Sequence, residues 1–357
     1  MYSKFAAFIA KIARLLSLNR QQPVQENKTY VYVANQGGNS ISQYVVAFDG
    51  HLAALAVAEV ATGTTPVFIA ISPARQHVYV ANQGGNSVSQ YNVSANGVLE
   101  ILGKPAMAGT SPVQIAMTPC GRFAYVANSS SNDVSQYVIN EGGMLEAMPI
   151  ATVATGLIPV AIGIDNSGKY VYVVNNSANN ISQYAISETG GLIALTPATI
   201  TAGMAPRGIS LDPSGKYVYV VNREGGDISH YAITGNGCLA EVSPPVRAGK
   251  HPISMSFSPS GAFAYVVNQN SNNISQFKLD ADGKLVPLPS PTVAVDLTPV
   301  WLSEVRTGKF AYVCNISSNN ISQFSVAEEG GLIPIPVNNW GDATIAAGVS
   351  PRCIVTT

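Results

Sequence analysis

Residues 77–93 read HVYVANQGGNSVSQYNV, and close variants of this stretch recur through the chain from residue 29 onward. The motif Tyr-Val-Ala-Asn or a near variant ends at seven asparagines spaced 46 or 47 residues apart: Asn35, Asn82, Asn128, Asn175, Asn222, Asn268 and Asn315. A proline before an apolar stretch recurs in step with them: Pro66, Pro112, Pro159, Pro206, Pro252, Pro299 and Pro351. The last interval is longer because of an insertion around Asn338, Asn339 and Trp340. A fixed period of this length indicates a repeat architecture.

Each repeat predicts four short strands. In the repeat that begins at Pro66, β-branched and aromatic runs predict strand A at Val67–Ser72, strand B at His77–Asn82, strand C at Ser87–Val93 and strand D from Val98. Turn signals such as Asn96-Gly97 separate them. Helical periodicity is absent after residue 27, which argues against a helical solenoid. The sequence therefore predicts an all-β fold, a seven-bladed β-propeller of four-stranded antiparallel blades.

The two ends of the repeat region predict how the ring closes. The first repeat begins at strand B, Thr29–Asn35, whereas residues 350–356 read as a strand A with no strand B after it. We expect the C-terminal strand to pair with the N-terminal blade and remove the open edge of the ring. The chain thus divides into an N-terminal segment, residues 1–27, and a propeller, residues 28–357.

Composition excludes several classes of protein. Of the 357 residues only 11% are charged, and the net charge is −1, whereas roughly 25% are charged in a typical soluble domain. Nucleic-acid binding needs a clustered excess of Lys and Arg, which is missing. No metal-ligand spacing or cofactor motif occurs, and four cysteines are too few for a disulfide scaffold. We expect a monomer without a cofactor or a metal, in which Cys314 and Cys353 are two buried thiols on neighbouring blades.

The Tyr-Val-Ala-Asn and Tyr-Val-Val-Asn repeats, followed by Asn-x-Ile-Ser-Gln-Tyr, resemble the YVTN-repeat propellers. The segment Asp212–Asn222 is also similar to the lactonase propeller family, which includes 6-phosphogluconolactonases and carboxymuconate cyclases. The resemblance covers residues 29–357 and implies the propeller fold. It implies activity less directly, because one fold hosts many functions.

The family's site motifs are only partly present. The family has a Gly-Pro-Arg-His stretch where this chain has Ala205-Pro206-Arg207-Gly208, so the resemblance implies Arg207 as a catalytic cation and finds no histidine. A family glutamate that directly follows Val-Val-Asn is displaced, because Arg223 holds that place and Glu224 comes next. The family's histidine and acidic loop of the preceding blade are absent from Ile158–Ala161 and Asn175–Asn179. If the chain is a lactonase, the resemblance implies Arg207 and Glu224 as its catalytic residues.

Deviations from the repeat point to a ligand site on strand A. The residue after the landmark proline is aliphatic in five repeats, but it is Arg207 and Arg352 in the other two. Five residues after the proline, one repeat carries Glu304 where five others are apolar. The first strand of a propeller blade lines the central channel, so the two arginines are expected at one height, three blades apart. Glu304 is expected about 13 Å deeper, from the rise per residue.

Two interpretations of these charges remain open. The first is a central site in which Arg207 and Arg352 clamp an anionic small molecule. The second is that both guanidiniums extend to solvent at the channel opening, and that Glu304 forms a structural ion pair with a nearby arginine.

A second charged group lies in loops of the fourth and fifth repeats, where the other loops are Gly, Ser, Asn and Thr. It consists of Arg223, Glu224, Asp227, Arg247, Lys250 and His251. This loop cluster is a candidate contact surface for a ligand or a protein partner, or else a solvated edge.

Two recurring polar residues are expected to stabilise the blades. The asparagines that end strand B are expected to bond nearby backbone groups. Six repeats carry a strand C glutamine that we expect to hydrogen-bond between blades, and the remaining repeat has His230, which we interpret as structural. The glutamines are Gln43, Gln90, Gln136, Gln183, Gln276 and Gln323.

Residues 1–27 stand outside the repeats. Phe5, Phe8, Ile9, Ile12, Leu15 and Leu16 recur at helical spacing, and basic residues outnumber acidic ones. The segment is a candidate amphipathic helix on a membrane surface, a short signal peptide, or a helix packed on the propeller. An exported or membrane-associated location is therefore favoured over a cytoplasmic one.

Two functions follow from these observations. The first is a non-enzymatic propeller that binds a protein partner or an anionic small molecule through one face, with Arg207, Arg352, Glu304, Arg223 and His251 as ligand-binding residues. The alternative is a lactone hydrolase of the 6-phosphogluconolactonase or carboxymuconate cyclase type. Turnover of a lactone by the pure protein distinguishes them.

Overall fold

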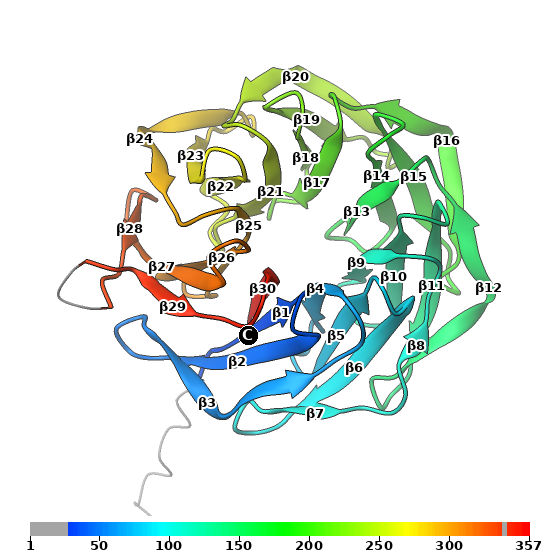
Figure 1. The fold of residues 1–357 in the computed structure, drawn as a ribbon. Coiled ribbons are helices and arrows are strands. Elements are labelled where there is room, and N and C mark those ends of the chain that lie inside the picture. The colour runs from blue at the N-terminus through cyan, green and yellow to red at the C-terminus, as the bar shows by residue number, and fades with distance from the viewer. Residues whose placement is uncertain (1–27, 338–340) are drawn as a thin grey trace, which may run out of the picture.

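The computed structural model describes residues 28–337 and 341–357, and every regular element within them is a strand. Seven antiparallel sheets stand as blades around a central axis (Figure 1). Strand A of each blade lies nearest the axis and strand D lies at the rim. The predicted all-β, seven-bladed propeller is confirmed. No helix in this part of the chain is long and apolar enough to cross a membrane.

The blades follow one another along the chain, each in the order A, B, C, D. Blade 1 contains β30 (Pro351–Thr356), β1 (Tyr30–Asn35), β2 (Ser40–Val46) and β3 (Leu52–Ala61). Blade 2 contains β4 (Pro66–Ile71), β5 (His77–Asn82), β6 (Ser87–Val93) and a divided strand D, β7 (Leu99–Ile101) and β8 (Ala106–Met107). Blade 3 contains β9 (Pro112–Met117), β10 (Phe123–Asn128), β11 (Asp133–Ile139) and β12 (Leu145–Ala154).

The remaining four blades repeat the pattern. Blade 4 contains β13 (Pro159–Ile164), β14 (Tyr170–Asn175), β15 (Asn180–Ile186) and β16 (Leu192–Thr201). Blade 5 contains β17 (Pro206–Leu211), β18 (Tyr217–Asn222), β19 (Asp227–Ile233) and β20 (Leu239–Arg247). Blade 6 contains β21 (Pro252–Phe257), β22 (Phe263–Asn268), β23 (Asn273–Leu279) and β24 (Leu285–Ala294). Blade 7 contains β25 (Pro299–Glu304), β26 (Phe310–Asn315), β27 (Asn320–Val326), β28 (Leu332–Pro334) and β29 (Thr344–Ala346).

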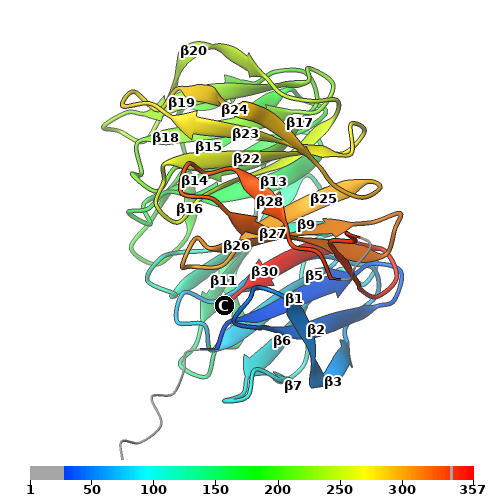
Figure 2. The same cartoon turned by 90° about the vertical axis from the view of Figure 1, so that its left-hand side faces the viewer.

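Blade 1 is assembled from two distant parts of the chain, as predicted. Its sheet order is β3-β2-β1-β30, and Val33 of β1 lies opposite Ile354 of β30. Figure 2 shows the red β30 beside the blue β1. The Tyr30 N–H donates to Thr357 Oγ1 at 2.8 Å, and the Thr357 N–H donates to Tyr30 O at 2.9 Å. The C-terminal strand thereby closes the ring.

Strand B of each blade is buried between neighbouring blades, and its tyrosine joins one blade to the next. Each hydroxyl donates to the carbonyl oxygen of a glycine in the C–D turn of the following blade. The pairs are Tyr32–Gly97, Tyr79–Gly143, Tyr125–Gly190, Tyr172–Gly237, Tyr219–Gly283, Tyr265–Gly330 and Tyr312–Gly50. Seven equivalent bonds therefore run around the ring.

The strand C glutamines also join neighbouring blades, as predicted. Each Oε1 accepts a bond of 2.6 or 2.7 Å from a leucine N–H at the start of the next strand D. The pairs are Gln43–Leu99, Gln90–Leu145, Gln136–Leu192, Gln183–Leu239, Gln276–Leu332 and Gln323–Leu52. His230 instead stacks on Tyr219 with ring centroids 4.5 Å apart, and in the described residues no side chain accepts the Leu285 N–H.

The asparagines that end strand B differ from the prediction. The Nδ2 of each donates to the hydroxyl of the serine seven residues later, at 2.8 or 2.9 Å. The tight B–C hairpin places this hydroxyl beside the amide, so these asparagines mainly bridge two strands through side chains. A backbone N–H bonds to the side-chain oxygen in two cases, Gly203 to Asn222 and Gly249 to Asn268.

Cys314 and Cys353 are fully buried free thiols, as expected. Burial raises the pKa of the Cys353 thiol to about 12. The predictions about residues 1–27 and about the insertion at Asn338–Trp340 lie outside the described residues.

Candidate functional site at the channel mouth and the neighbouring cleft

The inner strands enclose a cavity of about 60 Å³ at the end of the channel where each strand A begins. All seven residues that follow a landmark proline line it. Five of them are aliphatic, namely Val67, Val113, Val160, Ile253 and Val300, and two are Arg207 and Arg352. Phe68 and Trp301 also line the cavity, and their rings meet edge to face with centroids 5.1 Å apart. We call this cavity the channel mouth.

Arg207 and Arg352 are half-buried in the channel mouth. In residues 28–337 and 341–357 neither guanidinium forms an ion pair, and Arg207 Nη1 makes one long bond of 3.5 Å to Val160 O. Burial, together with the positive charges of Arg352 and Arg223, lowers the pKa of Arg207 to about 10. Burial also lowers the pKa of Arg352. Both side chains therefore remain charged at neutral pH, without a carboxylate to balance them.

Glu304 lies apart from the two arginines. It ends β25 and does not line the channel mouth. Both carboxylate oxygens are shielded from solvent and have no hydrogen-bond partner in the described residues. Burial raises the pKa of Glu304 to about 8. The expected structural ion pair with an arginine is therefore wrong, and Glu304 does not join the arginines in one site.

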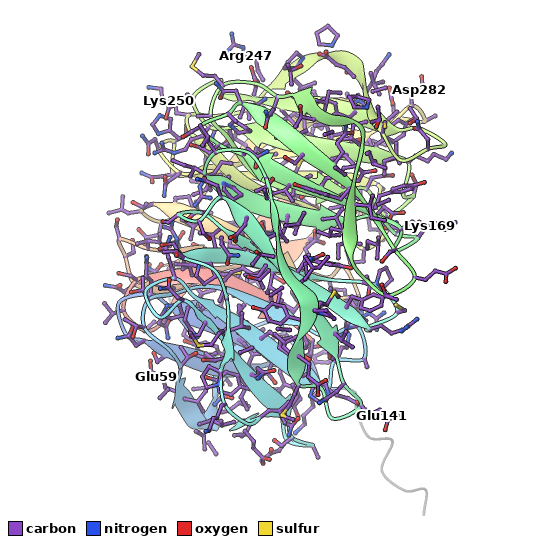
Figure 3. All side chains as sticks on the ribbon, turned by 90° about the vertical axis from the view of Figure 1, so that its right-hand side faces the viewer. Glu59, Glu141, Lys169, Arg247, Lys250 and Asp282 are labelled. Atoms are coloured by element: carbon purple, nitrogen blue, oxygen red, sulfur yellow. The ribbon has the colours of Figure 1, made fainter. Side chains whose placement is uncertain are left out.

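The loop cluster forms a second hollow on the same side of the ring. Five of its six members line a cleft of about 460 Å³ at the junction of blades 5 and 6: Arg223, Glu224, Arg247, Lys250 and His251. The sixth, Asp227, instead accepts a bond from Asn222 Nδ2 at 2.8 Å. In Figure 3, Arg247 and Lys250 lie at one edge of the ring, whereas Lys169 and Asp282 lie at the other. We call this hollow the blade 5–blade 6 cleft.

Glu224 is the acidic residue of the cleft. Its Oε1 lies 2.9 Å from Arg223 Nη1, and its Oε2 lies 3.4 Å from His251 Nε2. Arg247 Nη1 donates to Gly225 O at 3.4 Å. Because the charge of Arg223 also lowers the pKa of Arg207, the cleft and the channel mouth share one positive electrostatic field.

A third ring of polar contacts, which the sequence reasoning missed, shapes the cleft. At six junctions an asparagine Oδ1 in the B–C hairpin accepts a bond of 2.7–2.9 Å from the N–H of the residue before the next blade's landmark proline. These asparagines are Asn39, Asn86, Asn132, Asn179, Asn272 and Asn319. Blade 5 has Gly226 in this place. Alignment of the seven repeats could have found the exception, but its consequence is visible only where two blades meet.

No group of three or more His, Cys, Asp or Glu side chains in the described chain could hold a metal ion together. The arrangement instead offers two neighbouring hollows that are rich in cations. Unpaired guanidiniums bind carboxylates and phosphates, and they also stabilise oxyanions that develop during acyl transfer. The fold and this face thus define a seven-bladed propeller with an anion-accepting channel mouth.

Comparisons with known proteins agree with this class. A family model described as a lactonase, seven-bladed β-propeller, matches residues 145–253 and 243–352. The chain belongs to that family. No curated protein matches the chain significantly.

Solved structures show the same architecture. A candidate 6-phosphogluconolactonase of Bacteroides fragilis superposes with a TM-score of 0.81 at 19% identity, over 94% of this chain and 100% of that one. A periplasmic gluconolactonase of Pseudomonas aeruginosa gives 0.79 at 18% identity, over 93% and 99%. An inactive virginiamycin B lyase variant of Staphylococcus aureus gives 0.56 at 16% identity, over 80% and 87%. At these identities the likeness establishes the fold and leaves the activity to the site.

Proposed function

We propose that this propeller is a lactone hydrolase whose substrate binds at the channel mouth. The observation that carries the proposal is the pair Arg207 and Arg352, two half-buried guanidiniums without a carboxylate partner in the described residues. Membership of the lactonase family and likeness to a gluconolactonase and a candidate 6-phosphogluconolactonase support it.

The chemistry requires a cation and a base. Water attacks the lactone carbonyl, a base takes the water proton, and the ring C–O bond breaks so that the ring oxygen takes a proton and a hydroxy acid is released. Arg207 and Arg352 stabilise the oxyanion and then the product carboxylate. Val160 and Gly208 provide no base where the family resemblance implies histidines. The proposal therefore assigns the base to Glu224, held between Arg223 and His251.

Hydrolysis of 6-phosphogluconolactone, glucono-δ-lactone and a muconolactone tests the proposal, with the spontaneous rate subtracted. We expect Arg207→Met and Arg352→Met each to lower kcat about 100-fold, the effect of removing one oxyanion donor. Arg306→Met, on an exposed turn at the other end of blade 7, is the matched control and should retain full activity. If the wild-type chain hydrolyses none of the three lactones above background, the proposal fails.

A second candidate function is anion binding without turnover. The observation that favours it is the aliphatic character of most of the channel mouth, including Val160 at a position where the family resemblance implies a catalytic histidine. Calorimetric titration with gluconate and muconate separates the two functions. Binding that depends on Arg207 and Arg352, in a chain with no turnover, would support this second function.

A further inference from the structure

The junction of blades 5 and 6 lacks a side chain that the other six junctions possess. Gly226 stands where they have an asparagine, yet its backbone follows theirs. Its φ is +66°, against +49° to +56° for the six asparagines. The carbonyl oxygen of Gly226 accepts a bond from the Ala248 N–H at 2.9 Å, as the Asn179 carbonyl does from Ala202. Only the amide group is missing.

The missing amide leaves a donor without an acceptor. At the other junctions the asparagine Oδ1 accepts the N–H that precedes the landmark proline, and here that N–H belongs to His251. In the described residues nothing accepts it, and His251 Nδ1 is also buried without a partner. A Cβ built on Gly226 would meet only Gly249 O, at 3.5 Å. The cleft of about 460 Å³ therefore extends to the place of the missing side chain.

The charge of the cleft indicates what could occupy it. Arg223, Arg247 and Lys250 face a single carboxylate, that of Glu224, which Arg223 already contacts. Arg247 and Lys250 form no ion pair in the described part of the chain. The free groups are therefore cationic donors together with a backbone N–H, a set that suits a doubly charged oxyanion with several acceptor oxygens.

We propose that the blade 5–blade 6 cleft binds the phosphate group of a small molecule. One phosphate oxygen takes the place of the asparagine oxygen and accepts the His251 N–H. Arg247 and Lys250 contact the remaining oxygens. This site is separate from the channel mouth and does not depend on lactone hydrolysis.

The decisive variant is Gly226→Asn, which restores the residue of the other six junctions. Asparagine tolerates a positive φ, and Gly226 already has that backbone conformation. The new amide should occupy the phosphate site and accept the His251 N–H. We expect phosphate affinity to fall at least tenfold while the Tm rises by about 2 °C. Misfolding would lower the Tm, so it cannot produce this pair of results.

The matched control is Asn179→Gly, which removes the equivalent amide at the junction of blades 4 and 5. This variant should lose stability and keep the wild-type phosphate affinity. Lys250→Met should weaken phosphate binding by about tenfold without a change in Tm. Arg207→Met should leave phosphate affinity within threefold, because the channel mouth is a different site.

Calorimetry at fixed ionic strength would compare inorganic phosphate, glucose 6-phosphate, sulfate and succinate on the full chain. Preference for glucose 6-phosphate would identify an organic phosphate ester, and equal binding of inorganic phosphate would identify the free ion; both support the site. Equal affinity for succinate, no binding of either phosphate, unchanged affinity in Gly226→Asn, or loss of binding in Arg207→Met would overturn it.

Discussion

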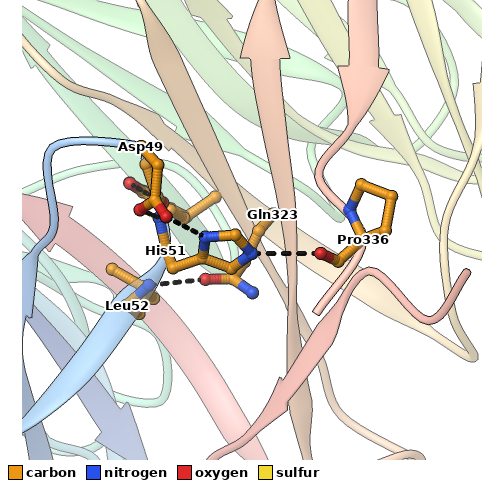
Figure 4. A network of polar contacts seen from close by, with 7 residues as sticks. Asp49, His51, Leu52, Gln323 and Pro336 are labelled. Carbon is orange, nitrogen blue, oxygen red and sulfur yellow. Dashed lines mark hydrogen bonds and ion pairs between the residues drawn. The ribbon is translucent and has the colours of Figure 1, made fainter. Parts of the chain in front are cut away.

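The Oε1 of Gln323 in blade 7 accepts a hydrogen bond of 2.7 Å from the N–H of Leu52 in blade 1, although 271 residues separate them (Figure 4). In the same view His51 Nδ1 lies 3.0 Å from Asp49 Oδ2, and His51 Nε2 lies 3.1 Å from Pro336 O. The carbonyl of Pro336 and the carboxylate of Asp49 raise the pKa of His51. The junction that closes the ring therefore uses the same glutamine contact as five other junctions.

Substitution of the exceptional residue should stabilise the ring. His230→Gln is expected to supply an acceptor for the Leu285 N–H and to remove the buried, unpartnered His230 Nε2. We expect the free energy of unfolding to rise by about 1 kcal/mol, measured by chemical denaturation. The reciprocal control, Gln136→His, should lower it by a similar amount. A lower stability of His230→Gln would show that stacking on Tyr219 outweighs the missing bond.

Removal of residues 351–357 should destabilise all seven blades together. The deletion exposes the edge of β1 and breaks the contacts of β30 with both of its neighbours, so we expect the Tm to fall by at least about 10 °C. Arg352→Met, which keeps the β30 backbone, is the control and should change the Tm little. A truncated chain that melts at the wild-type temperature would contradict closure by β30.

Glu304 should make stability depend on pH. Its pKa is raised from 4.5 to about 8 in the folded chain, so the folded state binds the proton more tightly than the unfolded state. Stability is then greatest below about pH 4.5 for this group, and it falls as pH rises towards 8, by at most about 1.4 kcal/mol per pH unit.

Denaturation of wild type and Glu304→Gln between pH 5 and pH 9 measures this contribution. The variant should be more stable at the alkaline end and should lack that part of the slope. Tyr265, which lies in the field of Glu304, already donates its hydroxyl to Gly330 O at 2.7 Å and gives the carboxylate no relief. Parallel curves for the two proteins would exclude a raised pKa at Glu304.

Two glycines should respond very differently to alanine. A Cβ on Gly97, whose φ is +81°, would lie 2.3 Å from the ring of Tyr30, whereas a Cβ on Gly235 would meet nothing within 4 Å. We expect Gly97→Ala to lower the free energy of unfolding by at least about 2 kcal/mol, and Gly235→Ala to stay within about 0.5 kcal/mol. Similar losses in both would mean that the C–D turn is not held against the neighbouring blade.

The sequence predicted the residues of the channel mouth better than their chemistry. Arg207 and Arg352 could be placed at one height because strand A repeats in register and alternates with a period of two. The same reasoning placed Glu304 deeper, but it suggested an ion pair that the structure does not contain. Whether a buried carboxyl finds a cation depends on side chains of neighbouring blades, and no periodicity within one repeat encodes them.

The sequence by itself determined the ring: seven repeats, four strands in each, and a final strand that completes the first blade. Those features follow from local signals, namely turn residues, strand alternation and a constant period. Only the tertiary structure showed that Gly226 and His230 both weaken the same junction, and that the cleft opens where an asparagine is missing. The physical reason is that these contacts cross from one blade to the next, so the effect of a substitution in one repeat appears in the backbone of another.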